Sequence, residues 1–290
     1  MDLGLFGSSP KKMTGIRQGT ASSFKWAALS QASKLGAQLL SVLVLSRLLP
    51  PEDFGLIAMA SVSTGFAALF RDLGTTAAII QKPDPNPRLL DSIFWLNVSF
   101  GVILALVFGL LAPVIAIGFA EPLLKDVLWV LFLAFPIASL AAVHQALLEK
   151  ASRFRPLAII ESTAAIGSLA GAFIAAWSGW GVYSLVLQTL LAAFISTVGL
   201  WVASKWRPAF RWEPNEIAGV FGYSGNLVGF NVFNYFIRNA DNMLIGRFLG
   251  ASELGYYSMA YRLMLWPLQN ISSVVGRVLF PEFSRLQATP

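Results

Sequence analysis

Three basic side chains lie inside long apolar stretches of the sequence, namely Lys34, Arg238 and Arg262. A cation at the centre of a bilayer costs about 2.5–3.5 kcal/mol on insertion scales. A water-filled cavity or an anionic ligand would offset this cost, and so would snorkelling of the side chain to the membrane surface. For Lys34 and Arg262 we favour the water-filled cavity as the explanation. Asp241 stands three residues after Arg238 and could neutralise that side chain locally.

Polar residues accompany these cations at helical spacing, so that they form stripes along one helix face. Hydrogen bonding between helices explains most of the neutral members. The cationic members predict an aqueous, positively charged cavity between two helical bundles. The four stripes consist of Ser30, Lys34, Gln38 and Ser41; Ser61, Thr64 and Arg71; Asn231, Asn234, Arg238 and Asp241; and Ser258, Arg262, Gln269 and Ser273.

Two acidic residues, Glu161 and Asp241, are candidate titratable groups for coupling to an ion, although Glu161 could instead pair with Arg153 or Arg155. The sequence has no cysteine, which excludes thiolate metal sites, disulfides and cysteine nucleophiles. A Ser-His-Asp triad or a zinc cluster would have to include the single histidine, His144, which packing explains better. Neither a Walker A loop nor a G-x-G-x-x-G fingerprint occurs. We therefore expect no catalytic residue, no metal and no cofactor, and the protein is not expected to be an enzyme.

The elements that must position these residues are membrane-spanning helices. The chain has 290 residues, of which 56% are hydrophobic and 12% are charged, and its mean hydropathy is +0.66. Soluble domains carry roughly 25% charged residues, so this composition excludes a soluble enzyme, a disordered tail and a disulfide scaffold. A helix needs about 20 apolar residues to cross the bilayer. Eight stretches qualify, and they cover residues 23–49, 54–70, 93–119, 127–148, 157–177, 182–203, 217–249 and 255–275.

The distribution of basic residues predicts the orientation of the chain in the membrane. Of the 21 Lys and Arg residues, fifteen fall on the N-terminal side of these spans and three on the other side. This asymmetry places the N-terminus in the cytoplasm of a multi-pass inner-membrane protein. It also explains the net charge of +6 without nucleic acid as a partner. Residues 1–22 are polar and predict a mobile cytoplasmic tail.

An internal repeat appears when the chain is shifted by 200 residues. Residues 43–60 then align with residues 243–260 with five identities in 18 positions, including Arg47 with Arg247 and Gly55 with Gly255. Both segments join an odd-numbered span to the next, so the repeat is parallel, with a pseudo-two-fold axis along the membrane normal. We expect an all-α polytopic membrane protein with a first six-helix bundle over residues 23–210. The start of a second bundle, cut short after two helices, would occupy residues 211–290, as in a fragment of a protein with twelve or more spans.

Ordered motifs along nearly the whole chain carry a family resemblance. They are SRLLPPEDFGLIAMA (46–60), DLGTTAAIIQ (72–81), FWLNV (94–98), LLEK (147–150), RFRPLAIIESTA (153–164), DNMLIGRFLGASELGYYSMAYR (241–262) and RVLFPEFSRLQ (277–287). The chain resembles the Wzx-type polysaccharide flippases of the multidrug/oligosaccharidyl-lipid/polysaccharide exporter superfamily, and most of all the colanic-acid and exopolysaccharide branch. The resemblance implies movement of undecaprenyl-diphosphate-linked oligosaccharides to the outer leaflet. It also implies membrane lipid as a partner, together with the polymerase and export machinery of the pathway.

The resemblance also implies a site. Helices 1, 2, 7 and 8 of such proteins are expected to line a central cavity. In the related flippases of lipid-linked peptidoglycan precursors, basic residues in helices 1, 2 and 8 are implicated in binding the diphosphate. Lys34, Arg71 and Arg262 fall in those helices here.

Two rival functions and an assembly role remain open at this point. A drug or organic-cation antiporter of the same superfamily would need carboxylates in its cavity, and the stripes contain only Asp241. A membrane-embedded glycan polymerase or ligase would need a large outer loop, whereas the predicted outer loops are short. A structural subunit gains weight only if the natural chain ends near Pro290.

Overall fold

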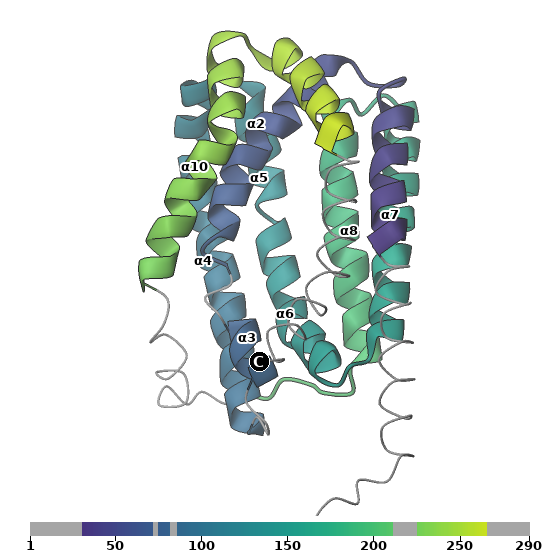
Figure 1. Ribbon diagram of the computed structural model, residues 1–290, viewed down its shortest axis with the longest axis vertical. Coiled ribbons are helices and arrows are strands. Elements are labelled where there is room, and N and C mark those ends of the chain that lie inside the picture. The colour runs from purple at the N-terminus through teal and green to yellow at the C-terminus, as the bar shows by residue number, and fades with distance from the viewer. Residues whose placement is uncertain (1–30, 72–74, 82–85, 211–224, 266–290) are drawn as a thin grey trace, which may run out of the picture.

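The long helices of the chain run side by side in a computed structural model, which describes residues 31–71, 75–81, 86–210 and 225–265 (Figure 1). Apart from their connections, the described residues are helical. Residues 1–22, Ser30, Pro267, Gln269 and Ser273 lie outside this part of the chain, and so does the start of the seventh predicted span. The helices are Gln31–Leu45, α2 (Pro51–Ala68), α3 (Thr75–Gln81), α4 (Pro87–Phe119), α5 (Leu123–Leu131), α6 (Ala134–Lys150), α7 (Phe154–Trp177), α8 (Val182–Ala203), α10 (Gly225–Phe248) and one over residues 251–265.

Four stretches of the described chain are long and apolar enough to cross a membrane, and they match the third to sixth predicted spans. They are α4, the pair α5 and α6, α7, and α8. In this group α4 packs on α6, α6 packs on α8, and α8 packs on α7. Large apolar side chains such as Leu110, Ile117 and Trp177 remain exposed. A surface of this kind suits lipid and not water, so the fold is an all-α polytopic membrane protein.

Proline and asparagine set helix boundaries that the apolar pattern predicts less well. The spans were expected to begin at residues 54 and 93, but α2 begins at Pro51 and α4 at Pro87. Proline suits the first turn of a helix because its missing N–H has no helical partner there. At α4, the side chain of Asn86 also accepts a hydrogen bond from the backbone N–H of Arg88. The fourth predicted span is two helices, because Pro136 has no N–H to donate to the carbonyl of Phe132.

Small residues let the helices approach closely. Gly167 and Gly171 of α7 face Ile195 and Leu191 of α8, where a larger residue would press against these side chains. Helix Gln31–Leu45 adds to this side of the bundle, where Leu45 packs in one core cluster with residues of α7 and α8. Figure 1 shows this purple helix beside α7, on the opposite side of the molecule from α10.

The helix over residues 251–265 crosses α2 in a reciprocal contact. A Cβ atom on Gly55 would overlap the carbonyl oxygen of Ala251, and one on Gly255 would overlap that of Pro51. The 200-residue shift exchanges the two contacts, because it relates Gly55 to Gly255 and Pro51 to Ala251. A two-fold axis that passes between two elements produces such a pair. The crossing lies at the upper end of α2 in Figure 1 and joins the two segments that the 200-residue shift relates.

The segment after α8 is anchored on the opposite end of the bundle. The indole N–H of Trp95 donates to the carbonyl of Ala209 at 3.0 Å, and the Ala209 N–H donates to Asp91 at the same distance. Phe210 stacks on Trp95 with ring centroids 4.3 Å apart. Nearby, His144 is fully buried and its ring lies 4.6 Å from that of Trp201, in agreement with a packing role. The chain is thus held against the first bundle up to residue 210, where the first domain was predicted to end.

Candidate functional site

Two polar pockets lie inside the first bundle, toward the end that carries α3. One has a volume of about 330 Å³ and is named here the Arg71 pocket, and the other has about 370 Å³ and is named the Lys34 pocket. They share Gln145 of α6 and Ser196 and Leu200 of α8, so the two pockets adjoin along a common wall. The other residues of the Arg71 pocket are Arg71, Thr75, Thr76, Asn97, Ala138, Ser139, Ala141, Ala142, Ala193 and Thr197. Those of the Lys34 pocket are Lys34, Leu157, Ile160, Glu161, Ala164, Ala165 and Ala192.

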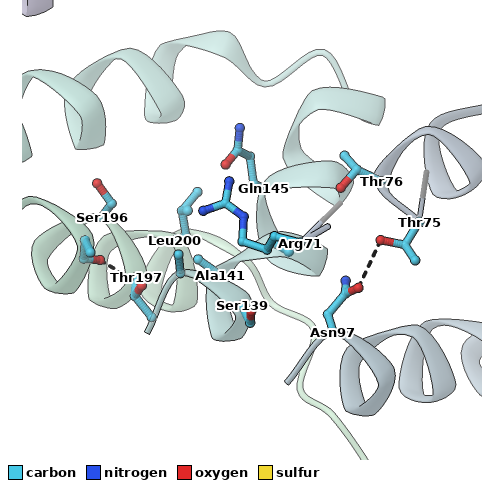
Figure 2. A pocket seen from close by; sticks show the side chains of 13 residues that line it. Arg71, Thr75, Thr76, Asn97, Ser139, Ala141, Gln145, Ser196, Thr197 and Leu200 are labelled. Atoms are coloured by element: carbon cyan, nitrogen blue, oxygen red, sulfur yellow. Dashed lines mark hydrogen bonds between the residues drawn. The ribbon is translucent and has the colours of Figure 1, made fainter. Parts of the chain in front are cut away.

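The Arg71 pocket is formed where α2 ends and α3, α4, α6 and α8 converge. Figure 2 shows the Arg71 side chain between the residues of α3 and α4 on one side and Ser196 and Thr197 on the other. The hydroxyl of Thr75 donates to the side-chain oxygen of Asn97 at 3.0 Å, and both residues are buried. This bond holds the start of α3 against α4. The pocket therefore combines one cation with hydroxyl and amide groups of fixed position.

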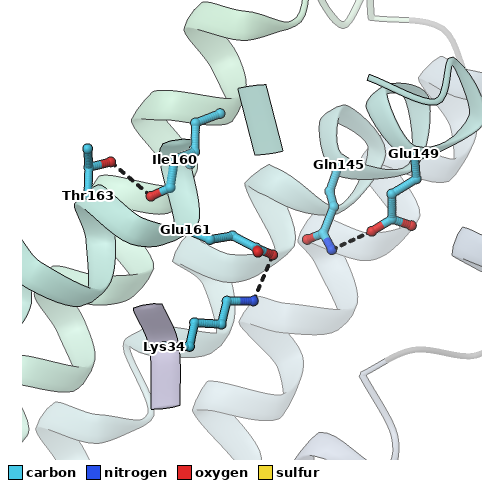
Figure 3. A network of polar contacts seen from close by, with 6 residues as sticks. All are labelled: Lys34, Gln145, Glu149, Ile160, Glu161 and Thr163. Atoms are coloured by element: carbon cyan, nitrogen blue, oxygen red, sulfur yellow. Dashed lines mark hydrogen bonds and ion pairs between the residues drawn. The ribbon is translucent and has the colours of Figure 1, made fainter. Parts of the chain in front are cut away.

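The Lys34 pocket contains an ion pair that crosses from the first helix to α7. Lys34 Nζ lies 2.8 Å from Glu161 Oε1, and the two side chains are 44% and 30% exposed. On the other side of the pocket, the amide of Gln145 donates to Glu149 at 2.8 Å (Figure 3). Arg153 and Arg155 were the partners that the sequence suggested for Glu161, and the structure also places Lys34 in contact with it. Lys34 therefore lines a polar pocket and also has a carboxylate as its partner.

The predicted site residues fall into two groups in the described part of the chain. Lys34, Arg71 and Glu161 line the adjoining pockets. On α10, Asn231, Asn234 and Arg238 are exposed, and Asp241 accepts a hydrogen bond of 2.6 Å from Tyr257. Arg262 and Gln38 are also exposed. Neither polar pocket includes any of these further residues.

Local neutralisation of Arg238 by Asp241 was one reading of the sequence. Within the described residues, however, no ion pair joins them, and Asp241 bonds to Tyr257 on the following helix. The hydroxyl of Tyr235, one turn before Asn239, donates to the carbonyl of Val62 at 2.8 Å. The polar groups of α10 thus serve partly to hold α10 against its neighbours.

Sequence reasoning missed the polar residues that α3, α4, α6 and α8 contribute. Asn97 lies within the FWLNV motif of an apolar span and carries no charge, so the sequence does not distinguish it as a site residue. Ser196, Thr197 and Leu200 share a helix face, and Ala193 precedes them by one turn. A face of small and hydroxyl residues in an apolar helix was the available signal. This signal could not show that Asn97, which precedes these residues by at least 96 positions, faces the same pocket.

The Lys34–Glu161 ion pair gives a prediction that separates folding from binding. Lys34→Glu is expected to lower the thermal stability of the full-length protein, because two carboxylates then face each other. The double swap Lys34→Glu with Glu161→Lys restores the attraction and should recover most of that stability. Melting temperatures of the purified variants measure both effects. Recovery of less than a third of the loss would show that the pair does not hold the first helix on α7.

Comparisons with known proteins give the family. The family model described as polysaccharide biosynthesis protein matches residues 44–290. The succinoglycan biosynthesis transport protein ExoT of Rhizobium meliloti (strain 1021) is 29% identical over 90% of this chain and 53% of its own. The teichuronic acid biosynthesis protein TuaB of Bacillus subtilis (strain 168) is 30% identical over 94% of this chain and 57% of its own. The lipopolysaccharide biosynthesis protein WzxC of Escherichia coli (strain K12) is 26% identical over 94% of this chain and 56% of its own.

These relatives are longer than this chain, which spans a little more than half of the length of each. No solved structure is significantly similar to the chain. The family match covers more than four-fifths of the residues and includes the helices that form both pockets, except the helix that carries Lys34. The chain therefore belongs to the family of polysaccharide biosynthesis proteins.

Proposed function

We propose that the protein translocates oligosaccharide units linked to undecaprenyl diphosphate from the cytoplasmic to the outer leaflet of the cytoplasmic membrane. Such units feed the biosynthesis of an exopolysaccharide, a capsule or an O-antigen. The observation that carries the proposal is the placement of Arg71 beside the polar wall of Gln145 and Ser196, inside an apolar bundle, in a pocket that no carboxylate of the described residues lines. A diphosphate is anionic, and cations in a low-dielectric cavity attract it strongly.

The names of the relatives support recognition of the substrate through its lipid diphosphate. They refer to succinoglycan, lipopolysaccharide and teichuronic acid, which are three different polymers. Proteins with the same helices and different glycans are expected to share what their substrates have in common. A lipid-linked diphosphate is such a common part, and it is the part that Arg71 is suited to bind.

The mechanism that we propose is alternating access. The diphosphate and sugars occupy the polar interior while the lipid tail stays in the bilayer, and the two bundles rock about the site. The reciprocal contact of Gly55 and Gly255 supports this scheme, because it lies where the two repeats meet. Chemistry on the substrate is not needed, so no catalytic residue is assigned. We expect the N-terminus to be cytoplasmic, and the released unit to pass to a polymerase and export machinery.

The rival functions fit the geometry less well. A cation antiporter needs an unopposed carboxylate in its cavity, whereas the only charged side chain of the described residues that lines the Arg71 pocket is Arg71 itself. In the Lys34 pocket, Glu161 already faces Lys34. A glycan polymerase needs a large outer loop, but α7 ends at Trp177 and α8 begins at Val182.

The proposed function is tested by deleting the parent gene in its host, with the genes that initiate the polymer left intact. Complete repeat units linked to undecaprenyl diphosphate are expected to accumulate on the inner leaflet. Mass spectrometry of extracted lipids identifies the units, and a membrane-impermeant sugar label assigns their leaflet. The full-length gene should restore the outer-leaflet pool.

Two controls make the outcome decisive. A strain that lacks the initiating glycosyltransferase should accumulate no lipid-linked unit, with or without the parent gene. Deletion that leaves both the leaflet distribution and the exported polymer unchanged would refute the proposed function in that host.

A further inference from the structure

We propose that the Arg71 pocket is a subsite for the sugar that is directly attached to the diphosphate, with Arg71 at its phosphate side. The inference rests on the proposed function and assigns a position to one part of its substrate. It places that sugar within the first bundle, between α3, α4, α6 and α8 (Figure 2). The central space between the two bundles would then hold the rest of the unit.

The chemistry of the lining is that of a glycosyl phosphate site. Thr75, Thr76, Ser196 and Thr197 supply hydroxyl groups that both donate and accept hydrogen bonds, and Asn97 supplies an amide. Sugar hydroxyls need this mixture of donors and acceptors. No carboxylate lines the pocket among the described residues, so an organic cation would lack a counter-charge.

Several of these polar groups still have hydrogen-bond donors or acceptors available for a ligand. The Thr75 hydroxyl bonds to the Asn97 oxygen, so the amide N–H groups of Asn97 can donate elsewhere. Thr197 donates to the backbone carbonyls of Ile137 and Ala193, and its oxygen can still accept. The buried hydroxyl oxygen of Ser139 has no hydrogen-bond partner in the described structure. Buried polar groups of native proteins are nearly always paired, so this wall is more polar than the fold alone requires.

The size of the pocket matches one sugar and not a whole repeat unit. Its volume of about 330 Å³ lies at the lower end of the roughly 300–1,000 Å³ typical of ligand sites. Alanines make the room, because Ala138, Ala141 and Ala142 of α6 and Ala193 of α8 all line it. A leucine at any of these positions would reduce the space.

Another cavity of the molecule is apolar, in contrast to the Arg71 pocket. A groove of about 500 Å³ between α2, α4 and α10 is lined mainly by apolar side chains, among them Phe66, Phe108 and Phe248. It offers a sugar few hydrogen bonds. The polar and apolar cavities are therefore separated within the described structure, and only the polar one adjoins Arg71.

The test measures how well the purified full-length protein distinguishes lipids with and without a sugar. The probes are undecaprenyl diphosphate and the same lipid carrying one glucose, one galactose or one N-acetylglucosamine. The wild type is expected to bind at least one sugar-bearing probe roughly tenfold more tightly than the bare lipid, because several polar groups would otherwise stay unpaired. Dissociation constants come from native mass spectrometry in nanodiscs.

Two variants and a matched control locate the effect. Ala142→Leu fills the pocket, and Thr76→Val removes one hydroxyl without changing the volume. Both should reduce the preference for the sugar-bearing probe at least threefold, where the preference is the ratio of that probe's affinity to the affinity of the same variant for bare undecaprenyl diphosphate. Ala170→Leu adds the same atoms at an exposed position of α7 and should retain the preference.

The possible failures are distinguishable. Equal affinity of the wild type for bare and sugar-bearing lipids would overturn the subsite, and so would a preference that survives both variants. In either case binding of the diphosphate lipid itself would leave the proposed function standing. If none of the diphosphate lipids binds, the proposed function fails and the subsite fails with it.

Discussion

Gly55→Ala and Gly255→Ala are each expected to destabilise the full-length protein by roughly 1–3 kcal/mol and to reduce transport severely. A methyl group at Gly55 would overlap the backbone of Ala251, and one at Gly255 would overlap the backbone of Pro51. Backbone atoms cannot rotate away as a side chain can, so the two helices must separate. Thermal melting of the purified variants and the outer-leaflet pool of lipid-linked units measure the two effects.

The control for these substitutions is Gly109→Ala on α4. A Cβ atom there would meet no atom within 4 Å, so the variant should be as stable as the wild type or slightly more stable. The double variant of Gly55 and Gly255 should lose less stability than the sum of the losses in the two single variants. Either methyl group alone already forces the two helices apart. Wild-type melting temperatures in both single variants would contradict the close contact between the repeats.

Arg71→Ala should weaken binding of undecaprenyl diphosphate by roughly 10- to 100-fold, because a charge-assisted hydrogen bond to phosphate contributes about 1.5–3 kcal/mol. Transport should fall in parallel. Arg71→Lys keeps the charge but loses the planar, two-pronged donor, so we expect it to recover part of the affinity. Dissociation constants for the bare lipid diphosphate are the direct measurement.

Lys205→Ala provides the comparison for Arg71. It removes an exposed cation just beyond the end of α8, and Lys205 lines neither polar pocket. Its affinity for the lipid should match that of the wild type. If Arg71→Ala lowers transport while its diphosphate affinity is unchanged, Arg71 acts in some other step and the assignment of its side chain to phosphate is wrong.

Much of the membrane architecture follows from the sequence because apolar runs of sufficient length have few alternatives in a bilayer. The third to sixth spans were predicted on this basis, and all four are confirmed. Their boundaries were less accurate, since the apolar pattern does not count the polar first turn that Asn86 and Pro87 begin. The apolar pattern predicted one span over residues 127–148, whereas the structure divides it before Pro136, whose missing N–H donor interrupts the helix locally.

The candidate site was predicted only in part. Lys34, Arg71 and Glu161 were recognised because an ionisable group within a span is conspicuous. Their neighbours Asn97, Gln145 and Ser196 were not, because neutral polar residues are common in membrane helices and usually bond to adjacent helices. Their role depends on which helix face turns toward which neighbour, and periodicity along one helix does not contain that information.

The sequence by itself determined that this protein is a helical membrane protein of the polysaccharide biosynthesis family, with related segments 200 residues apart. Composition and ordered motifs are properties of the chain and need no folded structure. Only the tertiary structure decided that Lys34 pairs with Glu161, that Arg71 shares a pocket with Asn97, and that Gly55 and Gly255 lie where α2 crosses the helix over residues 251–265. The partners in each case are separated by long stretches of chain. Such contacts depend on how the helices pack and rotate against one another, which is a property of the whole bundle.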